Sequence, residues 1–452
     1  MENSKENTIS ENKLGTMPIG KLLVVMSVPT TISMLIQALY NIVDSIFVSH
    51  YSEKALTAVS LAFPLQNLMI AFFVGTAVGI CSVISRRLGE KRDVDACNAA
   101  QTGYALTLVN IVIFVLVGTL LAKPFVMLYT DDAELVQMTT VYTRICLGLS
   151  FGSAINIFCE KSLQATGDTI HPMIIQASGA IFNIIFDPIL IFGYFGFPAM
   201  GITGAAVATV AGQIFAMILG ITFIRRNRYI KLNMLAVKFD KASIRDIMEV
   251  GVPSIIMQGI GTIMTSLMNA ILIAYDILAT TFFGVYFKIQ SFVFLPVFGM
   301  NSGLMPILGY NYGAKNRERT LKALRLGMVC AFLFMTLGFV IFATMPRTLL
   351  GMFNASEGLL AIGESALWKI ALSFPLASFS IMMGALYQAM GDGYLSMITS
   401  IVRQLLFLIP LTWILGRLFG LDALWFSFIL AEVIAFVLNI WFSKKEFKKL
   451  NF

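Results

Sequence analysis

Long apolar stretches recur along the chain and set its basic pattern. Residues 22–43, 56–84 and 326–345 carry no charged side chain. A helix of about 20 apolar residues crosses the roughly 30 Å hydrocarbon core of a membrane, and each stretch reaches that length. Lipid offers backbone groups no hydrogen-bond partner, so each stretch is expected to be helical. The pattern predicts an all-α, polytopic membrane protein.

Twelve segments fit this pattern of membrane spans. Because twelve is an even number, both termini are expected on the same side of the membrane. The predicted spans are residues 20–49, 56–84, 98–122, 140–164, 170–195, 201–224, 246–273, 280–310, 323–345, 360–388, 393–417 and 421–443.

The composition agrees with a lipid environment. Hydrophobic residues make up 58% of the 452-residue chain and charged residues only 13%, which is unlike soluble domains. The five cysteines lie within or at the ends of the spans without paired metal spacing, so we expect neither a disulfide framework nor a zinc site. The first nineteen residues are polar, and no cleavage site follows them, so no signal peptide is expected to be removed.

The basic residues indicate which side is cytoplasmic. Most of the 32 lysines and arginines fall in segments that alternate spans place on one side, and short basic loops are retained in the cytoplasm during insertion. These segments are the N-terminal tail and residues 86–92, 225–245, 315–325 and 444–449. Both termini are therefore predicted to be cytoplasmic. The net charge of +7 reflects this topology, and no nucleic-acid partner is expected.

The second half of the chain repeats the first at one constant offset in numbering, the offset that takes Pro29 to Pro253. Further matched pairs are Val28 with Val252, Tyr51 with Tyr275, Gln66 with Gln290, Gly75 with Gly299, Gly79 with Gly303, Gly89 with Gly313, Lys91 with Lys315, Gly167 with Gly391 and Asp168 with Asp392. Six helices in each half give both copies the same orientation. Such a parallel repeat is typical of a transporter whose two lobes rock about a central cavity.

We therefore predict two six-helix lobes joined by a basic linker. The predicted parts are the cytoplasmic tail 1–19, the first lobe 20–224, the linker 225–245, the second lobe 246–443 and the cytoplasmic tail 444–452. Glycines spaced four positions apart, at 75 and 79 and again in the repeat, allow helices to approach closely. We interpret them as packing residues.

Two of the carboxylates within predicted spans are the best candidates for a functional site, because a charge inside a membrane span is costly. Asp44 shares one helix face with Gln37, Tyr40 and Asn41, and Asp187 lies one turn after Asn183. Asp44 and Asp187 are expected to differ in depth by about one helical turn. We predict that both acids face a common cavity in the outer half of the first lobe.

Neutral oxygen donors are available for the same place. Asn156, and either Thr203 or Thr209, could complete the cluster around the two acids. Such a cluster suits sodium, which takes oxygen ligands, or a proton shared between buried carboxylates. The sequence leaves the choice between these ions open. The repeat pairs Asp44 with Met268 and Asp187 with Leu411, so the ion chemistry is expected in the first lobe alone.

The second half has its own ionisable residues within spans. They are Lys288, Glu364, Lys369, Arg403 and Glu432. Glu364 and Lys369 lie near the outer end of their span, where they can reach interfacial water, and Arg403 is expected to extend toward the membrane surface. The roles of Lys288 and Glu432 stay open.

Taken together, these segments resemble the multidrug and toxic compound extrusion (MATE) family over essentially the whole chain, and most of all its MepA-type and DinF-type bacterial branches. The segments that carry the resemblance are residues 29–89, 164–168, 183–188, 201–209 and 306–315. The resemblance implies a bacterial inner-membrane exporter of hydrophobic, often cationic drugs or dyes in exchange for H⁺ or Na⁺. No cofactor is expected, and we expect a monomer in the lipid bilayer.

The resemblance also implies a site. Its ion-coupling residues correspond to Asp44, Asn183 and Asp187 with a threonine of the sixth helix, and a second-lobe site of the NorM type is not expected, because no acid lies around Gly261 and Ala377. The residues that we expect to line a cargo cavity are Gln37, Tyr40, Asn41, Gln66, Met69 and Phe151.

Two other functions fit the sequence less well. A lipid-linked sugar flippase of the same superfamily would share this layout, but its cavity should be basic. An intramembrane enzyme is suggested by the G-x-S-x-G pattern of 148–152, which requires a strand-turn-helix context that a membrane span cannot supply. Residues 165–168 and 389–392 are similar to the G-x-G-D motif of membrane aspartyl proteases, but both lack its first glycine. The two histidines, His50 and His171, are predicted on opposite sides of the membrane, so neither completes a triad with Ser150.

Overall fold

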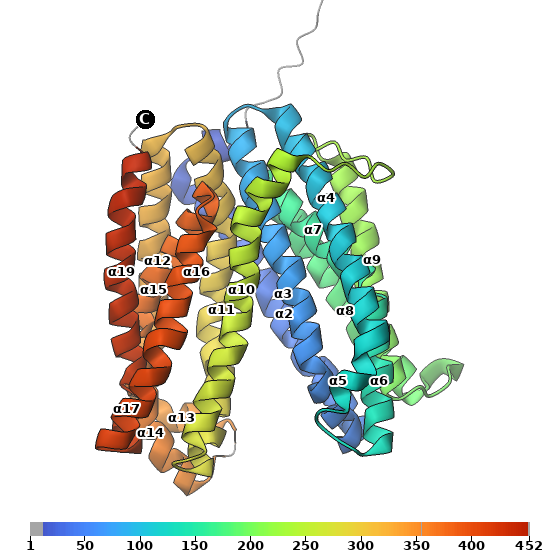
Figure 1. Cartoon of the computed structure of the whole chain (residues 1–452), viewed down its shortest axis with the longest axis vertical. Coiled ribbons are helices and arrows are strands. Elements are labelled where there is room, and N and C mark those ends of the chain that lie inside the picture. The colour runs from blue at the N-terminus through green and yellow to red at the C-terminus, as the bar shows by residue number, and fades with distance from the viewer. Residues whose placement is uncertain (1–11, 354, 451–452) are drawn as a thin grey trace, which may run out of the picture.

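The computed structural model describes residues 12–353 and 355–450, and this part of the chain is built of helices (Figure 1). The elements are α1 (Lys13–Thr16), α2 (Ile19–Tyr51), α3 (Glu53–Gly89), α4 (Asp93–Leu116), η1 (Val117–Leu121), α5 (Ala122–Val126), α6 (Ala133–Gly148), α7 (Phe151–Ala165), α8 (Ile170–Phe192), η2 (Tyr194–Gly196), α9 (Ile202–Arg226), α10 (Lys241–Leu272), α11 (Ile277–Gly313), α12 (Arg317–Thr344), α13 (Pro346–Gly351), α14 (Glu357–Ala371), α15 (Phe374–Met390), α16 (Gly393–Ile401), η3 (Val402–Leu408), α17 (Ile409–Phe419), α18 (Leu421–Leu424) and α19 (Ser427–Lys449).

The twelve predicted spans are confirmed, with two of them bent. Among the described residues, ten helical segments are long and apolar enough to cross a membrane, and two bent pairs complete the twelve. The spans predicted at 140–164 and 360–388 are each formed by two helices that meet at an angle, of 44° and 47°. Both breaks leave two residues between the helices. Pro375 lies in the first turn of α15, after the second break, where its missing N–H has no intrahelical partner to lose.

The helices gather in two bundles that lean against each other at one end (Figure 1). The first bundle holds α2 to α9 and the second holds α10 to α19. Unusual backbone conformations recur at matched positions of the repeat: Lys91 and Lys315 have φ of 58° and 54°, and Gly167 and Gly391 both have φ of 96°. Because a lysine rarely adopts a positive φ, two such lysines at matched positions show that the repeat is present in the backbone conformation of the turns as well as in the sequence.

Glycines at matching positions form the contact between the bundles. A Cβ on Gly89 would lie 1.9 Å from the carbonyl oxygen of Tyr310, and a Cβ on Gly313 would lie 2.1 Å from that of Arg86. The two contacts are equivalent, because Gly313 is the counterpart of Gly89 in the repeat and Tyr310 is the counterpart of Arg86. Backbone from each half therefore packs directly on the other half with pseudo-two-fold symmetry.

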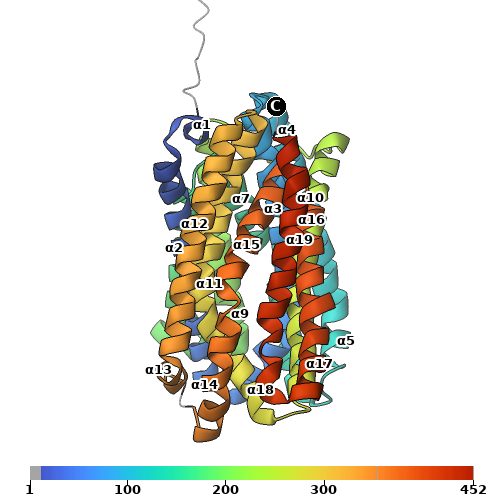
Figure 2. The ribbon, with the colours of Figure 1, turned by 90° about the vertical axis from the view of Figure 1, so that its left-hand side faces the viewer.

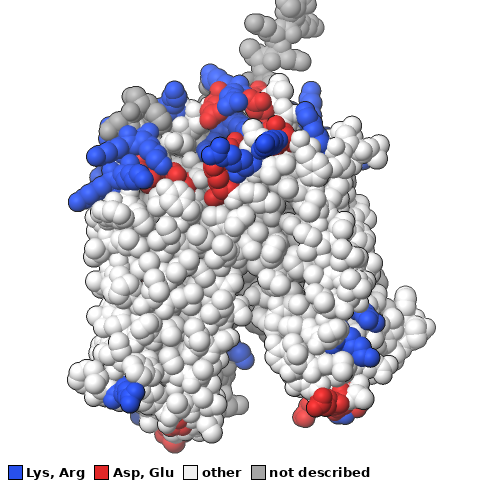
Figure 3. All heavy atoms as spheres, in the orientation of Figure 1, with Lys and Arg blue, Asp and Glu red and all other residues white. Residues whose placement is uncertain are grey.

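The four glycines interpreted as packing residues extend this seam. A Cβ on Gly75 would meet Ile255 and one on Gly299 would meet Thr31, the counterpart of Ile255 in the repeat. All these contacts lie in the half of the molecule that contains the α3–α4 turn. The bundles are thus closed against each other there, and a cleft separates them at the opposite end (Figure 3).

Basic side chains gather at the closed end (Figure 3). We call it the basic end; it carries the α3–α4 turn, the linker between α9 and α10, and both ends of the described chain. The predicted tail 1–19 is described only from Asn12, and residues 451–452 of the tail 444–452 also lie outside the described residues. Within the described parts, Leu14 is fully buried and α19 continues to Lys449. Seen from the side, α12 and α19 of the second bundle extend over most of the length between the two ends, and α15 lies beside them (Figure 2).

Candidate functional site

Asp44 and Asp187 lie close together, although they come from different helices. Asp44 is seven residues before the end of α2 and Asp187 five before the end of α8. The two carboxyl groups are close enough to interact with each other. The depth difference of about one turn expected from the sequence shrinks to roughly two residues, or about 3 Å. Asp187 is 0% exposed.

Asn183 and Thr209 complete the cluster around the acids. Asn183 Nδ2 donates to Asp187 Oδ1 at 3.1 Å and to Thr209 Oγ1 at 3.3 Å. Three buried acceptors, Asp44 Oδ1, Asp187 Oδ2 and Asn183 Oδ1, have no donor among residues 12–353 and 355–450. Buried acceptors without a donor are destabilising unless an ion or proton satisfies them. The cluster therefore offers unpaired acceptor oxygens on three neighbouring side chains to a proton or a small cation.

Tyr40 links the cluster to a second polar layer. Its hydroxyl lies close to Thr209 and to both carboxyl groups. Behind it, Gln66 interacts with Tyr142 and Cys146. The sequence did not connect Tyr142 or Cys146 with Gln66. Their position one turn apart in the fourth predicted span gave no sign that they would meet Gln66 of the second span.

A cavity of about 660 Å³ lies between the bundles beside this cluster. Tyr40, Asn183 and Thr209 belong to its wall, whereas Asp44 and Asp187 lie behind them. Gln37 also lines the cavity, and its amide oxygen accepts a hydrogen bond from Gln176 Nε2 at 2.8 Å. Three residues, Tyr40, Asn183 and Thr209, therefore lie between the acids and the cavity.

Two of the proposed neutral ligands lie elsewhere. Thr203 is six residues before Thr209 near the start of α9, which separates them by about 9 Å along the axis and places them on different faces. Asn156 lines the cavity but interacts with Glu160, one turn later in α7. Glu160 was missed by the sequence analysis, although a carboxylate inside a predicted span was a usable signal.

The other predicted cargo residues lie outside the cavity wall. Asn41 is exposed on α2, Met69 is buried in the packed core of the first bundle, and Phe151 begins α7 after the break. Gln66 belongs to the second polar layer described above. Of the six residues expected to line the cavity, the structure places Gln37 and Tyr40 there.

The ionisable residues of the second half are mostly paired. Glu364 pairs with Arg347, and Lys369 is buried and pairs with Asp422. The expectation that Arg403 extends toward the membrane surface is wrong: its Nη1 lies 3.1 Å from Glu432 Oε2. A buried carboxylate attracts the guanidinium inward. Lys288 is exposed on α11 and has no ion-pair partner within the described chain.

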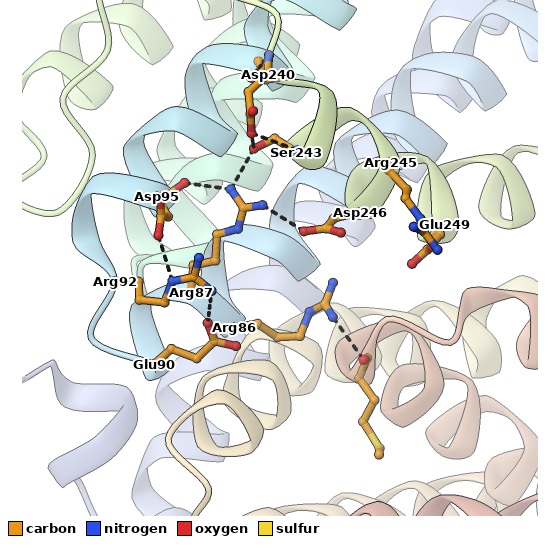
Figure 4. A network of polar contacts seen from close by, with 12 residues as sticks. Arg86, Arg87, Glu90, Arg92, Asp95, Asp240, Ser243, Arg245, Asp246 and Glu249 are labelled. Atoms are coloured by element: carbon orange, nitrogen blue, oxygen red, sulfur yellow. Dashed lines mark hydrogen bonds and ion pairs between the residues drawn. The ribbon is translucent and has the colours of Figure 1, made fainter.

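A polar network spans the bundles at the basic end (Figure 4). Arg87 of α3 donates to Ser243 Oγ at 2.7 Å and to Asp246 Oδ2 at 2.8 Å, both on α10. Arg86 donates to the carbonyl oxygen of Met390 at 3.1 Å. Asp240, the N-cap of α10, accepts from Ser243, and this hydrogen bond lowers the pKa of Asp240. Charged hydrogen bonds thus reinforce the glycine contacts that close this end.

Replacing Arg87 by alanine is expected to open the cavity toward the basic end. Loss of its charged hydrogen bonds should cost the closed arrangement about 1 to 3 kcal/mol. A cysteine at Gln258, an exposed position in the cavity wall, reports the change in a background without the five native cysteines. Labelling by an impermeant maleimide applied from the basic end should rise several-fold. Arg245→Ala, at an exposed pair with Glu249, is the control, and equal labelling in both variants would contradict a closing role for Arg87.

A family model described as MatE matches residues 29–189 and again 253–414. The second match starts at the repeat counterpart of the residue where the first one starts, so the model recognises each half of the internal repeat. The two matches together cover well over half of the chain.

Curated relatives resemble the chain over most of its length. It is 25% identical to an FAD transporter of Shewanella oneidensis, covering 87% of each chain. It is 27% identical to the probable multidrug resistance protein NorM of Thermotoga maritima, covering 92% of this chain and 90% of the relative. It is 25% identical to the multidrug export protein MepA of Staphylococcus haemolyticus, covering 92% and 91%.

Solved structures show the same architecture. One described as the outward-facing conformation of a multidrug resistance MATE family transporter superposes with a TM-score of 0.91 at 25% identity, covering 99% of this chain and all of the other.

Proposed function

Since this chain belongs to the MatE family of transporters, we propose that it is a secondary antiporter that exports hydrophobic, often cationic compounds in exchange for H⁺ or Na⁺. The family membership makes the chain a multi-pass membrane transporter of the multidrug efflux type and not an enzyme. We propose further that the coupling ion and the cargo compete, and that residues beside the cavity cause this competition.

The observation that carries the proposal is the convergence of Asp44, Asp187 and Asn183 with buried acceptor oxygens that have no donor in the described chain. An entering cation satisfies these oxygens. A cationic cargo held in the adjacent cavity is attracted by the same negative charge. An ion bound at the acids screens their negative charge from the cargo. Binding of the ion therefore weakens binding of the cargo, and the reverse also holds.

Ion binding and cargo binding are coupled through three residues, Tyr40, Asn183 and Thr209. Each lines the cavity and each interacts with the acids or with one another. When the ion binds, Asn183 and Tyr40 turn their polar groups toward it and away from the cargo. The cargo then loses hydrogen bonds at the moment when the charge that attracted it is neutralised.

We place the basic end in the cytoplasm, as the distribution of lysine and arginine indicates. The cleft then opens outward, and both termini are cytoplasmic. In this arrangement the ion enters from outside, the cargo leaves outward, and the closed seam at the basic end separates the cavity from the cytoplasm. The protein acts as a monomer in a bacterial inner membrane.

The alternative of a lipid-linked sugar flippase is less well supported. A site for lipid phosphates needs surplus positive charge, whereas two carboxyl groups lie just behind the cavity wall of the first bundle. The hydrolase-like segment offers no support for an enzyme either. Ser150 lies buried at the break between α6 and α7, and His171 pairs with Asp168.

Purified protein in proteoliposomes provides the test. Ethidium transport is measured under a proton gradient without sodium, and under a sodium gradient at uniform pH. The proposal expects one of the gradients to drive ethidium against its concentration difference. Transport driven by neither gradient would reject antiport, and the gradient that drives it identifies the ion.

A further inference from the structure

Arg403 lies where two cavities meet. The cavity beside the acid pair, of about 660 Å³, shares part of its wall with a second cavity of about 560 Å³ that is lined mainly by the second bundle. The shared residues are Gln258, Leu295, Phe298, Arg403 and Gln404. The two cavities are therefore neighbouring parts of one cleft, and Arg403 supplies a positive charge to both.

Glu432, which also lines the second cavity, holds the guanidinium of Arg403. Its Oε2 and Oε1 lie 3.1 Å and 3.4 Å from Nη1 of Arg403. Glu432 is 5% exposed, while the side chain of Arg403 is 25% exposed. The carboxylate thus occupies one edge of the guanidinium. The N–H groups of Nε and Nη2 have no partner within residues 12–353 and 355–450 and are left for a molecule in the cleft.

The backbone places Arg403 at this depth. It lies ten residues after the start of α16, or about 15 Å from the basic end of its span. It belongs to the π-helical stretch η3, which packs on α19, the helix of Glu432. Short π-helical stretches often occur at functional sites, because they redirect side chains from the regular helical positions.

Aromatic side chains surround the same part of the cleft. Phe287, Phe294 and Phe428 line the second cavity. Phe294 lies 6.0 Å from Phe298, and Tyr286 lies 6.1 Å from Phe428 between ring centroids. Such rings offer faces and edges to a planar molecule.

We propose that Arg403 binds the anionic group, carboxylate or phosphate, of an aromatic cargo, with Glu432 as its positioning residue. The proposal rests on the export function and extends it: the second-half wall of the cleft accepts the negative end of a cargo molecule while the acid cluster attracts a positive end. The fork of N–H donors on arginine matches the paired oxygens of a carboxylate or phosphate.

The opposing possibility is that Arg403 and Glu432 only hold η3 against α19. A purely structural pair would affect every cargo alike, because its loss would change the shape of the whole cleft. Binding of matched ligands separates the two possibilities. Riboflavin and flavin mononucleotide share one aromatic ring system and differ by a phosphate. Norfloxacin supplies a carboxylate, and ethidium is a cation without an acidic group.

Equilibrium binding of these four ligands is measured by fluorescence on the purified full-length chain in detergent. In Arg403→Gln, affinity for flavin mononucleotide or norfloxacin should fall about tenfold or more, while riboflavin and ethidium change by less than about twofold. Loss for flavin mononucleotide alone identifies a phosphate site, and loss for norfloxacin alone a carboxylate site. Arg417→Gln, on the same span but stacked on Trp413, should change nothing.

Arg403→Gln leaves Glu432 buried without its partner, so the double variant Arg403→Gln, Glu432→Gln is measured as well. It should fold and show the same selective loss. Equal weakening of all four ligands in the double variant would overturn the proposal, as would an unchanged affinity for both acidic ligands. Wild-type protein that exports ethidium yet binds neither acidic ligand would also overturn it while leaving the proposed antiport intact.

Discussion

Asp187→Asn and Asp44→Asn are expected to abolish gradient-driven efflux of ethidium. Each substitution keeps the size of the side chain and removes the negative charge that the entering ion neutralises. A membrane potential of 100 mV contributes about 2.3 kcal/mol per charge moved, which corresponds to about a fiftyfold ratio of concentrations. Without coupling, the ratio of ethidium concentrations across the membrane should fall to the value set by passive leakage.

The geometry suggests that Asp187 is the more sensitive of the two. It is fully buried and receives the hydrogen bond from Asn183, whereas Asp44 is only partly buried. An asparagine at position 187 could present its own amide N–H groups to Asn183, which would disrupt the contact with Thr209. We therefore expect Asp187→Asn to lose transport completely and Asp44→Asn to retain at most a small part.

Efflux is measured in cells that express each variant at equal levels in the membrane. Asp131→Asn, at an exposed loop position, controls for the general effect of removing a carboxylate. Thermal stability in detergent shows whether the variants are folded. Wild-type efflux in both Asp44→Asn and Asp187→Asn would show that the acid pair has no part in coupling.

Gly89→Val and Gly313→Val are expected to give the second large effect by preventing closure of the basic end. A side chain at either position would overlap a backbone carbonyl of the opposite bundle, and backbone cannot move aside as a flexible side chain can. Overpacking costs about 1 to 3 kcal/mol. A difference of this size shifts a two-state equilibrium by about 5- to 150-fold. The bundles should therefore favour the arrangement that is open at the basic end.

The pseudo-two-fold symmetry makes this prediction more specific. Because Gly89 and Gly313 occupy equivalent places in the seam, the two variants should behave alike, although they lie in different halves of the chain. Both should lose ethidium efflux. Both should also raise maleimide labelling of the Gln258→Cys reporter from the basic end.

Gly284→Val is the matched control, since it lies in the same helix as Gly313 and a Cβ there has open space. It should leave efflux and labelling near those of the parent. Normal efflux in Gly89→Val would mean that the seam need not close during transport.

The spans and the repeat could be predicted because they depend on patterns along the chain. Apolar length determines whether a helix crosses a membrane, and the constant offset of the repeat appears in residue identity alone. The breaks after Gly148 and Ala371 could not be predicted with equal ease. Only the second has a proline near it, and two short helices can be as apolar as one long helix.

The candidate site could be predicted in part. Asp44 and Asp187 were identifiable because charges are rare inside membrane spans, and Asn183 followed from its spacing to Asp187. Partners from other helices depend on how helices rotate against each other, which no single span reveals. Thr203 and Thr209 were therefore equivalent in sequence but not in space, and the contact between Arg403 and Glu432 appeared only once η3 was placed against α19.

The central claim is that a cation at the acid pair and a cargo in the cleft oppose each other's binding. Ethidium affinity of the purified protein, measured while protons or sodium are titrated, tests this claim most directly. In wild-type protein the affinity should fall as the coupling ion is added. In Asp187→Asn the bound ethidium should no longer respond to that ion. The same ion dependence in both proteins, or none in the wild type, would contradict the account.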